Sequence, residues 1–169
     1  GNITNVWNAA DYVPYRSADP KMEGTFGANL GERGFQLNLF FHYRFGGYLY
    51  NNTLVNRVEN VDPNQNVDSR VFGQRWKQPG DVAYFKAIDN TAVTRPTSRF
   101  VEKDNLIELR SVNLSYVFSN KAFLNRIGAE TLRLNAFMND VFRTSKVKTE
   151  RGIDYPFARH FAFGLQVTF

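Results

Sequence analysis

Hydrophobic and polar residues alternate strictly between Phe35 and Phe45. The odd positions of this stretch are all apolar or aromatic, and four of its five even positions are polar. A period of two residues indicates a β-strand with one dry face and one wet face. The same alternation returns between Phe161 and Phe169. A slip of one residue would turn every apolar side chain to the wrong face, so the orientation of both strands is strongly specified.

Three weaker alternations complete a set of five predicted antiparallel strands. The predicted ranges are 25–31, 35–46, 106–118, 131–142 and 158–169. The third strand contains a discrepancy, because extending its alternation toward the N-terminus places Glu108 and Arg110 on the apolar face. Either the apolar zone ends there and the Arg110 side chain reaches out to polar surroundings, or a β-bulge beside Arg110 exchanges the two faces.

The predicted connections differ greatly in length. A tight hairpin turn is expected at Gly31-Glu32-Arg33-Gly34. One or two helical turns are expected in 119–130, and a polar loop of medium length in 143–157. The connection 46–105 is far longer than a loop in a compact domain usually is. A short turn on one side and a long loop on the other are typical of transmembrane barrels.

Two environments give a strand one dry and one wet face. In a soluble β-sandwich the apolar face packs against a second sheet. In an outer-membrane barrel the apolar face contacts lipid and the polar face lines the lumen. The predicted wet faces here carry small, uncharged residues such as Gly27, Ser115 and Gly164, and the dry faces are rich in Phe and Tyr. This favours an all-β meander in a barrel. Five strands cannot close one, so we expect a larger protein, with Gly1 a processed end or an internal cut.

Composition and charge exclude several classes of protein. Cysteine is absent, which excludes disulfides, thiolate metal sites and cysteine nucleophiles. No apolar stretch approaches the roughly 20 residues of a membrane-spanning helix. The formal net charge is +5, but the basic excess lies in the predicted connections 121–133 and 143–151. Phosphate binding needs cations gathered on one face, so no nucleic-acid partner is expected.

Several motifs occur in order along nearly the whole chain. They are Asp19-Pro20-Lys21-Met22-Glu23-Gly24-Thr25-Phe26, Gly46-Gly47-Tyr48-Leu49-Tyr50-Asn51, Arg75-Trp76-Lys77-Gln78-Pro79-Gly80-Asp81, Ser98-Arg99-Phe100-Val101-Glu102 and Tyr155-Pro156 followed by Arg159. This ordered set resembles the C-terminal part of the SusC/RagA family of TonB-dependent outer-membrane transporters of Bacteroidetes. One departure is at Trp7, which stands where an EF-hand-like segment of the family has its closing carboxylate. We therefore expect no metal there.

The resemblance implies that residues 1–169 are the C-terminal segment of a plugged barrel of about 22 strands. The chain would supply the last five strands, residues 1–22 the end of an extracellular loop, and 46–105 a long extracellular loop. The implied function is import of large nutrients, oligosaccharides or peptides. The implied partners are a SusD-like lipoprotein, the TonB complex acting on a plug and TonB box outside this chain, the remaining barrel, the barrel-assembly machinery and outer-membrane lipid. The C-terminus would lie in the periplasm.

Candidate site residues fall into three groups. No catalytic constellation, metal site or cofactor site is expected. The lumen-facing candidates, expected to contact the plug, are His42, Arg44, Asn113, Arg133, Asn135 and His160. The aromatic candidates in the long loop, which suit a sugar or a partner protein, are Phe72, Trp76, Tyr84 and Phe85. For Trp76 we favour a buried ring that anchors the loop. The candidate assembly signal comprises Phe161, Phe163, Leu165, Val167 and Phe169.

Two other functions are compatible with the pattern. One is a passive porin or adhesin barrel, and the other is a soluble glycan-binding β-sandwich. A plug domain and a TonB box upstream of this segment would distinguish the importer from the porin. Solubility of this chain alone as a monomer would favour the sandwich.

Overall fold

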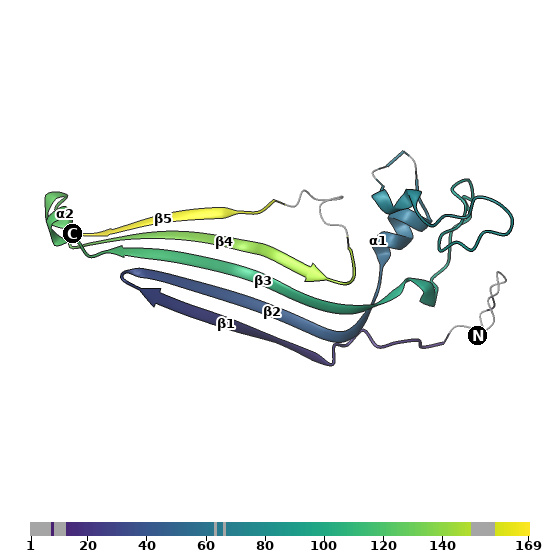
Figure 1. Cartoon of the computed structure of the whole chain (residues 1–169), viewed down its shortest axis with the longest axis horizontal. Coiled ribbons are helices and arrows are strands. Elements are labelled where there is room, and N and C mark those ends of the chain that lie inside the picture. The colour runs from purple at the N-terminus through teal and green to yellow at the C-terminus, as the bar shows by residue number, and fades with distance from the viewer. Residues whose placement is uncertain (1–7, 9–12, 63, 66, 150–157) are drawn as a thin grey trace.

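The computed structural model describes residues 8, 13–62, 64–65, 67–149 and 158–169. These residues form one five-stranded sheet in the order β1-β2-β3-β4-β5 (Figure 1). The strands are β1 (Met22–Glu32), β2 (Phe35–Tyr50), β3 (Val101–Phe118), β4 (Thr131–Ser145) and β5 (Phe161–Thr168). Each strand pairs antiparallel with its neighbour in sequence. The prediction of an all-β antiparallel meander is confirmed.

The two ends of the sheet differ in character. The β1–β2 turn, the helix α2 (Lys121–Arg126) and Phe169 lie at one end (Figure 1). The connection between β2 and β3 lies at the other end, with its short helical segments α1 (Asn52–Leu54), η2 (Val55–Glu59), η3 (Ser69–Phe72) and η4 (Ser98–Phe100). These are called the turn end and the loop end below. Within the described ranges, no helix is both long enough and apolar enough to cross a membrane.

The tight turn at Arg33 and Gly34 needs a glycine for two reasons. The backbone of Gly34 has a φ of +90°, a region that residues with a Cβ rarely adopt. A Cβ at this position would also lie 2.6 Å from the carbonyl oxygen of Val117. The turn is therefore held against the end of β3, and the N–H of Val117 donates to the Gly34 carbonyl at 2.8 Å.

A β-bulge at Arg110 resolves the discrepancy in the third predicted strand. Phe40 pairs with Ser111, but the next residue, Phe41, pairs with Leu109. Arg110 is therefore the extra residue, and the alternation of β3 changes phase there. Beyond the bulge Leu109 turns to the apolar face and Glu108 to the polar face. Of the two explanations for Arg110, the bulge is correct.

Strand β4 is irregular at the same level. Ser111 of β3 pairs with Asn139, and Leu109 pairs with Phe142. Asp140 lies between them with a φ of +50°. Aspartate and asparagine tolerate this left-handed conformation better than other residues with a side chain. This explains why a short polar residue occupies position 140.

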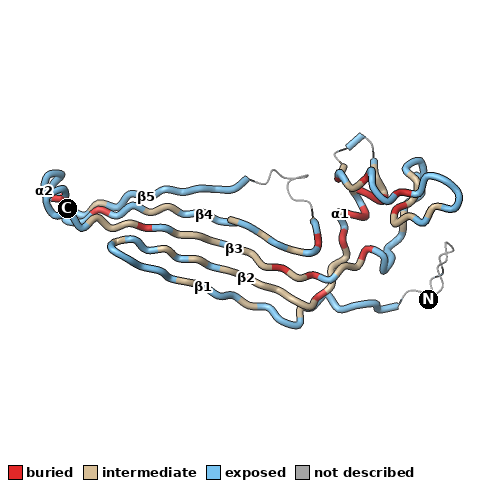
Figure 2. Tube along the Cα trace, viewed as in Figure 1, coloured by how far each residue is buried: buried red, intermediate tan, exposed pale blue. Residues whose placement is uncertain are grey.

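A hydrophobic core cluster lies outside the sheet. Its buried members are Leu54, Val55, Val58, Phe85 and Phe100, with Tyr50 and Tyr84 packed against them. Figure 2 shows buried residues concentrated at the loop end, whereas most strand residues are exposed or intermediate. The sheet therefore leaves both faces largely open, and residues 51–100 fold around a core of their own. These residues are called the loop unit below.

Two sequence motifs fall outside the described residues. Trp7, with the EF-hand-like segment before it, is one of them. Tyr155 and Pro156 are the other.

Candidate functional site

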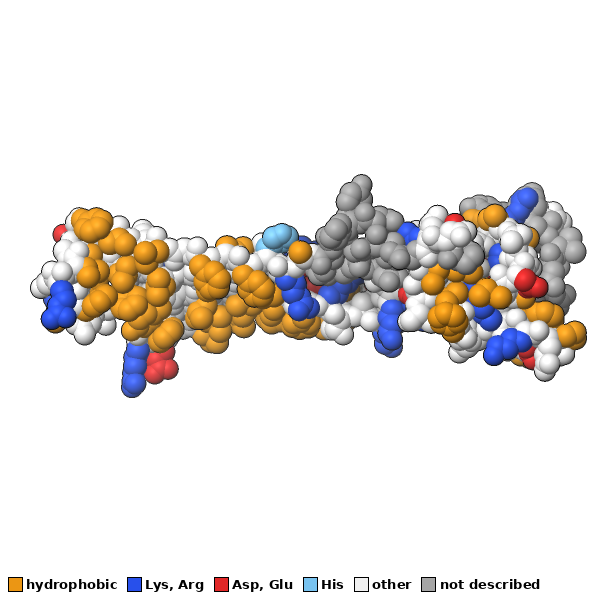
Figure 3. Space-filling view, turned by 90° about the horizontal axis from the view of Figure 1, so that it is seen from above, with side chains coloured by type: hydrophobic (Ala, Val, Ile, Leu, Met, Phe, Trp, Pro, Cys, Tyr) orange, Lys and Arg blue, Asp and Glu red, His pale blue; other side chains and the backbone are white. Residues whose placement is uncertain are grey.

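The cross-strand register places apolar residues from all five strands on one face. One row across the sheet consists of Leu30, Leu37, Leu114, Ala136 and Phe163, and a second of Ala28, Leu39, Val112, Met138 and Phe161. We call this side the apolar face. Figure 3 shows hydrophobic side chains gathered in a band along the strands. All five strands belong to one sheet, so the apolar face has no second sheet against it among the described residues.

Aromatic rings on the apolar face form two groups. Toward the loop end, the rings of Phe26 and Phe41 stack with their centroids 4.8 Å apart. Toward the turn end, the ring centroids of Phe35 and Tyr116 are 4.3 Å apart. The rows between them are mainly aliphatic. An apolar band flanked by aromatic belts is the arrangement that transmembrane barrels present to lipid.

The opposite side of the sheet, the inner face, carries a charged cluster around His42. This histidine is only 5% exposed. Its Nε2 lies 3.0 Å from Oε1 of Glu23, and its Nδ1 lies 3.1 Å from Nη2 of Arg110. Arginine only donates hydrogen bonds, so Nδ1 accepts. The network therefore assigns the proton to Nε2, which donates to Glu23.

Glu108 extends the same cluster to a fourth strand. Its Oε2 lies 3.4 Å from Nε of Arg110, and its Oε1 lies 3.4 Å from Nε of Arg143. We call Glu23, His42, Glu108, Arg110 and Arg143 the inner charge cluster. It joins β1 to β4 and balances two carboxylates against two guanidinium groups. Only the bulge makes this possible, since it turns Glu108 to the inner face.

A second ionic contact lies nearer the loop end. Arg44 donates to Oδ2 of Asp104, and the N–H of Gly46 donates to Oδ1 of Asn105 at 3.1 Å. Within the described residues, three buried polar atoms of the inner face have no hydrogen-bond partner: Nε of Arg44, Oδ1 of Asp104 and Oδ1 of Asn113. Groups of this kind need a partner when they are buried. These three atoms stay without a hydrogen-bond partner inside the described part of the sheet.

The structure distributes the lumen-facing candidates along the inner face. Asn113, Arg133 and Asn135 occupy the same side of the sheet as His42, at register positions nearer the turn end. Only His42 belongs to the charged cluster, and Arg44 lies next to it. His160 precedes β5 and is exposed. The sequence pattern missed Glu23, Glu108 and Arg110 as partners of His42, because no spacing within one strand signals contacts across strands.

The loop unit is organised around a buried carboxylate. Glu59 is 1% exposed. Its Oε1 accepts hydrogen bonds from Nη2 of Arg99 and, at 2.9 Å, from Oγ1 of Thr94. Its Oε2 accepts the backbone N–H of Lys86 at 3.1 Å. Burial lowers the pKa of the nearby Lys86 ammonium, and Glu59 opposes that shift. One carboxylate thus ties together three separate stretches of the loop.

Arg75 performs the complementary role as a donor. It is buried, and its guanidinium donates to the backbone carbonyl groups of Val71, Lys86 and Val58. Burial lowers the pKa of Arg75. The remainder of its motif is a turn, in which Oδ2 of Asp81 accepts the N–H groups of residues 77 and 78 at 3.0 Å each. The motif is therefore a structural element of the loop.

The four loop aromatics occupy different environments. Phe85 is buried in the core of the loop unit. Tyr84 is partly buried, its hydroxyl donates to the carbonyl oxygen of Arg99, and burial raises its pKa. Phe72 is 80% exposed and Trp76 is 39% exposed. The expectation that the Trp76 ring is buried as an anchor is wrong, because the neighbouring Arg75 takes that role. Of the four, Phe72 and Trp76 are the exposed ones.

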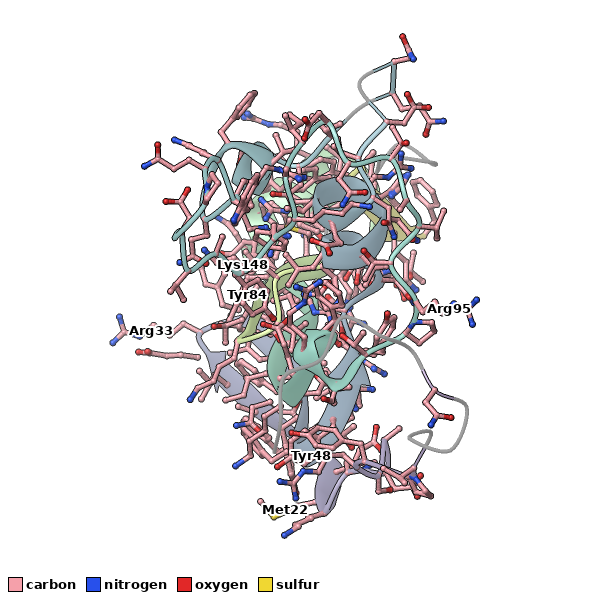
Figure 4. All side chains as sticks on the ribbon, turned by 90° about the vertical axis from the view of Figure 1, so that its right-hand side faces the viewer. Met22, Arg33, Tyr48, Tyr84, Arg95 and Lys148 are labelled. Carbon is pink, nitrogen blue, oxygen red and sulfur yellow. The ribbon has the colours of Figure 1, made fainter. Side chains whose placement is uncertain are left out.

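A shallow pocket of about 290 Å³ lies where the loop unit meets the segment after β4. The guanidinium of Arg70 donates two hydrogen bonds to the carboxylate of Asp68, and its Nη2 also donates to the carbonyl oxygen of Lys148 at 3.0 Å. The hydrogen bonds from Arg70 lower the pKa of Asp68. Figure 4, which looks from the loop end, places Lys148 and Tyr84 centrally, with Met22 and Tyr48 at the lower edge.

The chemistry of these groups suits binding and structural support. Among the described residues, no three His, Asp or Glu side chains are arranged to hold a metal ion. The candidate assembly residues lie on the apolar face of β5 or follow it, and Phe163 and Phe169 are strongly exposed. The absence of catalytic activity and of a cofactor stays a prediction.

Comparison with known proteins finds similarity to a receptor sequence and to solved structures of similar fold. No protein-family model matches the chain. A TonB-dependent receptor of Formosa agariphila is 29% identical over 125 residues, which cover 70% of this chain and 12% of that protein. The RagAB peptide importer in its open-open state has a TM-score of 0.70 at 19% identity. In its closed-closed state the TM-score is 0.71 at 18% identity. Both matches cover 98% of this chain and 19% of the solved one.

Proposed function

We propose that this chain is a segment of a TonB-dependent transporter of the SusC/RagA type and forms part of the wall of an outer-membrane barrel that imports large nutrients. The observation that carries the proposal is the division of one sheet into two faces. Apolar rows run across all five strands on one side, and the inner charge cluster joins four strands on the other. A barrel wall with one lipid-facing and one lumen-facing surface accounts for the apolar rows and for the inner charge cluster.

The edges of the sheet support incorporation into a larger barrel. Among the described residues, β1 and β5 each have one paired neighbour. Their outer backbone groups would be unsatisfied in lipid, and barrels avoid that penalty by closing. We propose that the missing strands bring the total to about 22, and that this segment supplies the last five of them.

The inner face would then contact a plug inside the barrel. The polar side chains of Arg133 and Asn135, exposed and partly exposed on this face, offer it hydrogen-bonding groups. A TonB-linked movement of that plug would open the path, with energy from the inner membrane. Loop length supports an orientation with the loop end outside the cell and the turn end in the periplasm, since periplasmic turns are short. The C-terminal residue would lie on the periplasmic side.

The loop unit is suited to contact a partner at the cell surface. Its own core and the Glu59 and Arg75 networks make it a rigid platform. Its exposed aromatic side chains, Phe72 and Trp76, are of the type enriched in interfaces and sugar sites. We propose a SusD-like lipoprotein as that partner. Peptides are the first substrate class to test, since the structures of similar fold are peptide importers; oligosaccharides are the second.

Growth and uptake measurements test this function. A strain that lacks the gene, and one that carries the full-length protein without its TonB box, should both lose uptake of the nutrient. Each would be grown on defined peptides or oligosaccharides as the limiting nutrient. Co-purification with a surface lipoprotein would test the partner. The alternative of a passive porin predicts a steady open conductance of the purified barrel in planar bilayers, and uptake that persists without TonB.

A further inference from the structure

The helix α2 at the turn end has an apolar side that continues the apolar face of the sheet. The ring of Phe123 lies 5.9 Å from the ring of Phe118. Phe118 pairs with Leu132, which in turn pairs with Val167, so all three belong to the apolar face. Phe123 therefore extends this face beyond the last residue of β3.

A second apolar side chain, that of Ile127, belongs to the C-cap residue directly after α2. Ile127 follows Phe123 by four positions and its N–H donates to the Phe123 carbonyl oxygen at 3.3 Å, so the last helical turn places both residues on one side. Each is 42% exposed, although both are large hydrophobic residues. Leu124, which follows Phe123, is buried. The segment thus holds itself in place with Leu124 and presents Phe123 and Ile127 outward.

The charges on α2 have one sign. Its sequence from Lys121 to Arg126 contains two basic residues and no acidic one. Lys121 and Arg126 are both exposed; Lys121 lies two positions before Phe123, and Arg126 directly precedes Ile127. The nearest acidic residue in the chain is Glu130, whose N–H donates to the carbonyl oxygen of Thr168. Exposed apolar side chains flanked by basic ones are typical of segments that lie in a phospholipid interface.

We propose that α2 is a membrane-surface anchor that inserts Phe123 and Ile127 into the periplasmic leaflet of the outer membrane. Lys121 and Arg126 contact the phosphate groups of phospholipids there. This inference rests on the proposed function, because it requires the apolar face to be in lipid. It adds that the turn end is held at the membrane surface and so fixes how deeply the barrel sits in the outer membrane. Phe123 continues the apolar face, which lies against lipid in the proposed barrel. Lipid is therefore favoured over a periplasmic protein as the occupant.

Spin labels at single cysteines test the anchor. The full-length transporter, with any cysteine outside this segment replaced, is placed in nanodiscs containing phosphatidylglycerol and phosphatidylcholine. Nitroxides are attached to the variants Phe123→Cys, Ile127→Cys, Asn125→Cys and Leu39→Cys. Power saturation then compares the accessibility of each label to oxygen, which partitions into lipid, and to a water-soluble nickel chelate. Asn125 is the matched control on the same helix, and Leu39 reports on the apolar face itself.

The labels at 123 and 127 are expected to be more accessible to oxygen than to nickel, and the label at 125 the reverse. Replacing Lys121 and Arg126 with glutamine should shift the label at 123 toward water without changing the label at 39. A water-exposed label at 123 beside a lipid-exposed label at 39 would overturn the anchor and leave the proposed barrel intact. Water exposure at both positions would reject the lipid-facing assignment on which both depend.

Discussion

The guanidinium of Arg110 lies 3.1 Å from Nδ1 of His42, although the two residues are 68 positions apart in the chain. The contact exists because Arg110 is the extra residue of a β-bulge. The bulge also turns Glu108 to the same side, where its Oε2 lies 3.5 Å from Nδ1 of His42. One irregularity in β3 thus assembles the inner charge cluster.

Removal of Arg110 should destabilise the barrel modestly. In Arg110→Ala, Nδ1 of the buried His42 loses its donor and Glu108 loses one of its two cations. A buried acceptor without a partner costs about 1–3 kcal/mol. The Arg110 side chain is half exposed, so water can replace some of its hydrogen bonds in the variant. We therefore expect a loss of unfolding free energy at the low end of this range, about 1 kcal/mol. The measurement is the temperature at which the folded, heat-modifiable form of the full-length protein disappears.

Arg133→Ala is the control for that experiment. Arg133 is exposed on the same face, and exposed substitutions of this kind usually change stability by less than about 0.5 kcal/mol. An equal loss in both variants would mean that the loss of any positive charge on the inner face, rather than the contact with His42, is responsible.

Leu39→Arg should impair assembly far more than Asn38→Arg. Leu39 lies between Ala28 and Val112 on the apolar face, whereas Asn38 lies between Asn29 and Asn113 on the inner face. Arginine on the lipid face near the bilayer midplane costs about 2–4 kcal/mol, and a lumen position avoids this cost. The yield of heat-modifiable barrel in the outer membrane measures the difference. Similar yields from the two neighbouring substitutions would contradict the assignment of the faces.

Arg75→Met should unfold the loop unit without unfolding the sheet. The substitution leaves the carbonyl groups of Val58, Val71 and Lys86 without their donor. At about 1 kcal/mol or more for each, the loss is about 3 kcal/mol. We expect rapid cleavage within 51–100 by proteinase K, while the heat-modifiable barrel persists.

Two variants control the Arg75 experiment. Arg75→Lys keeps the charge but loses the planar fork that reaches several acceptors, so it should rescue only part of the protection. Trp76→Ala changes the exposed neighbour and should leave the cleavage rate nearly unchanged. Protection of the loop unit in Arg75→Met would show that the hydrophobic core alone maintains its fold.

The contribution of Asp68 to the loop unit should disappear in acid. Its pKa is lowered in the folded protein from the ordinary value of 3.8, chiefly by the hydrogen bonds from Arg70. A carboxyl whose pKa is lower when folded stabilises the fold fully above its unfolded pKa and progressively less as the pH falls through its folded pKa. The stabilisation is therefore complete well above pH 3.8 and declines below it.

The comparison of the parent protein with Asp68→Asn isolates this effect from other carboxylates. Hydrogen exchange of the amides of residues 68–72 would be measured at a series of pH values. The parent should be better protected than the variant at pH 6, and the two should converge as the pH falls below 3.8. A difference that is constant with pH would assign the effect to the hydrogen-bond geometry of the side chain and not to its charge.

The sequence alone determined which side of each strand is apolar. Residues such as Phe35, Leu37, Phe161 and Phe163 lie on the predicted face, because a period of two leaves only two possible orientations. The same argument predicted the meander, since neighbouring alternating segments joined by a turn pair readily. For Arg110 the pattern narrowed the possibilities to two, and only the pairing of β2 with β3 identified the bulge.

Only the tertiary structure decided which side chains meet. Periodicity carries no information about how far one strand slides along another, so the contacts of His42 with Glu23 and Arg110 follow from the register. In the loop unit no period exists at all. Arg75 rather than Trp76 is the buried anchor because its guanidinium satisfies three backbone carbonyl groups of the folded loop. Those acceptors converge only after the chain has folded, and a buried carbonyl must find a donor wherever one can reach it.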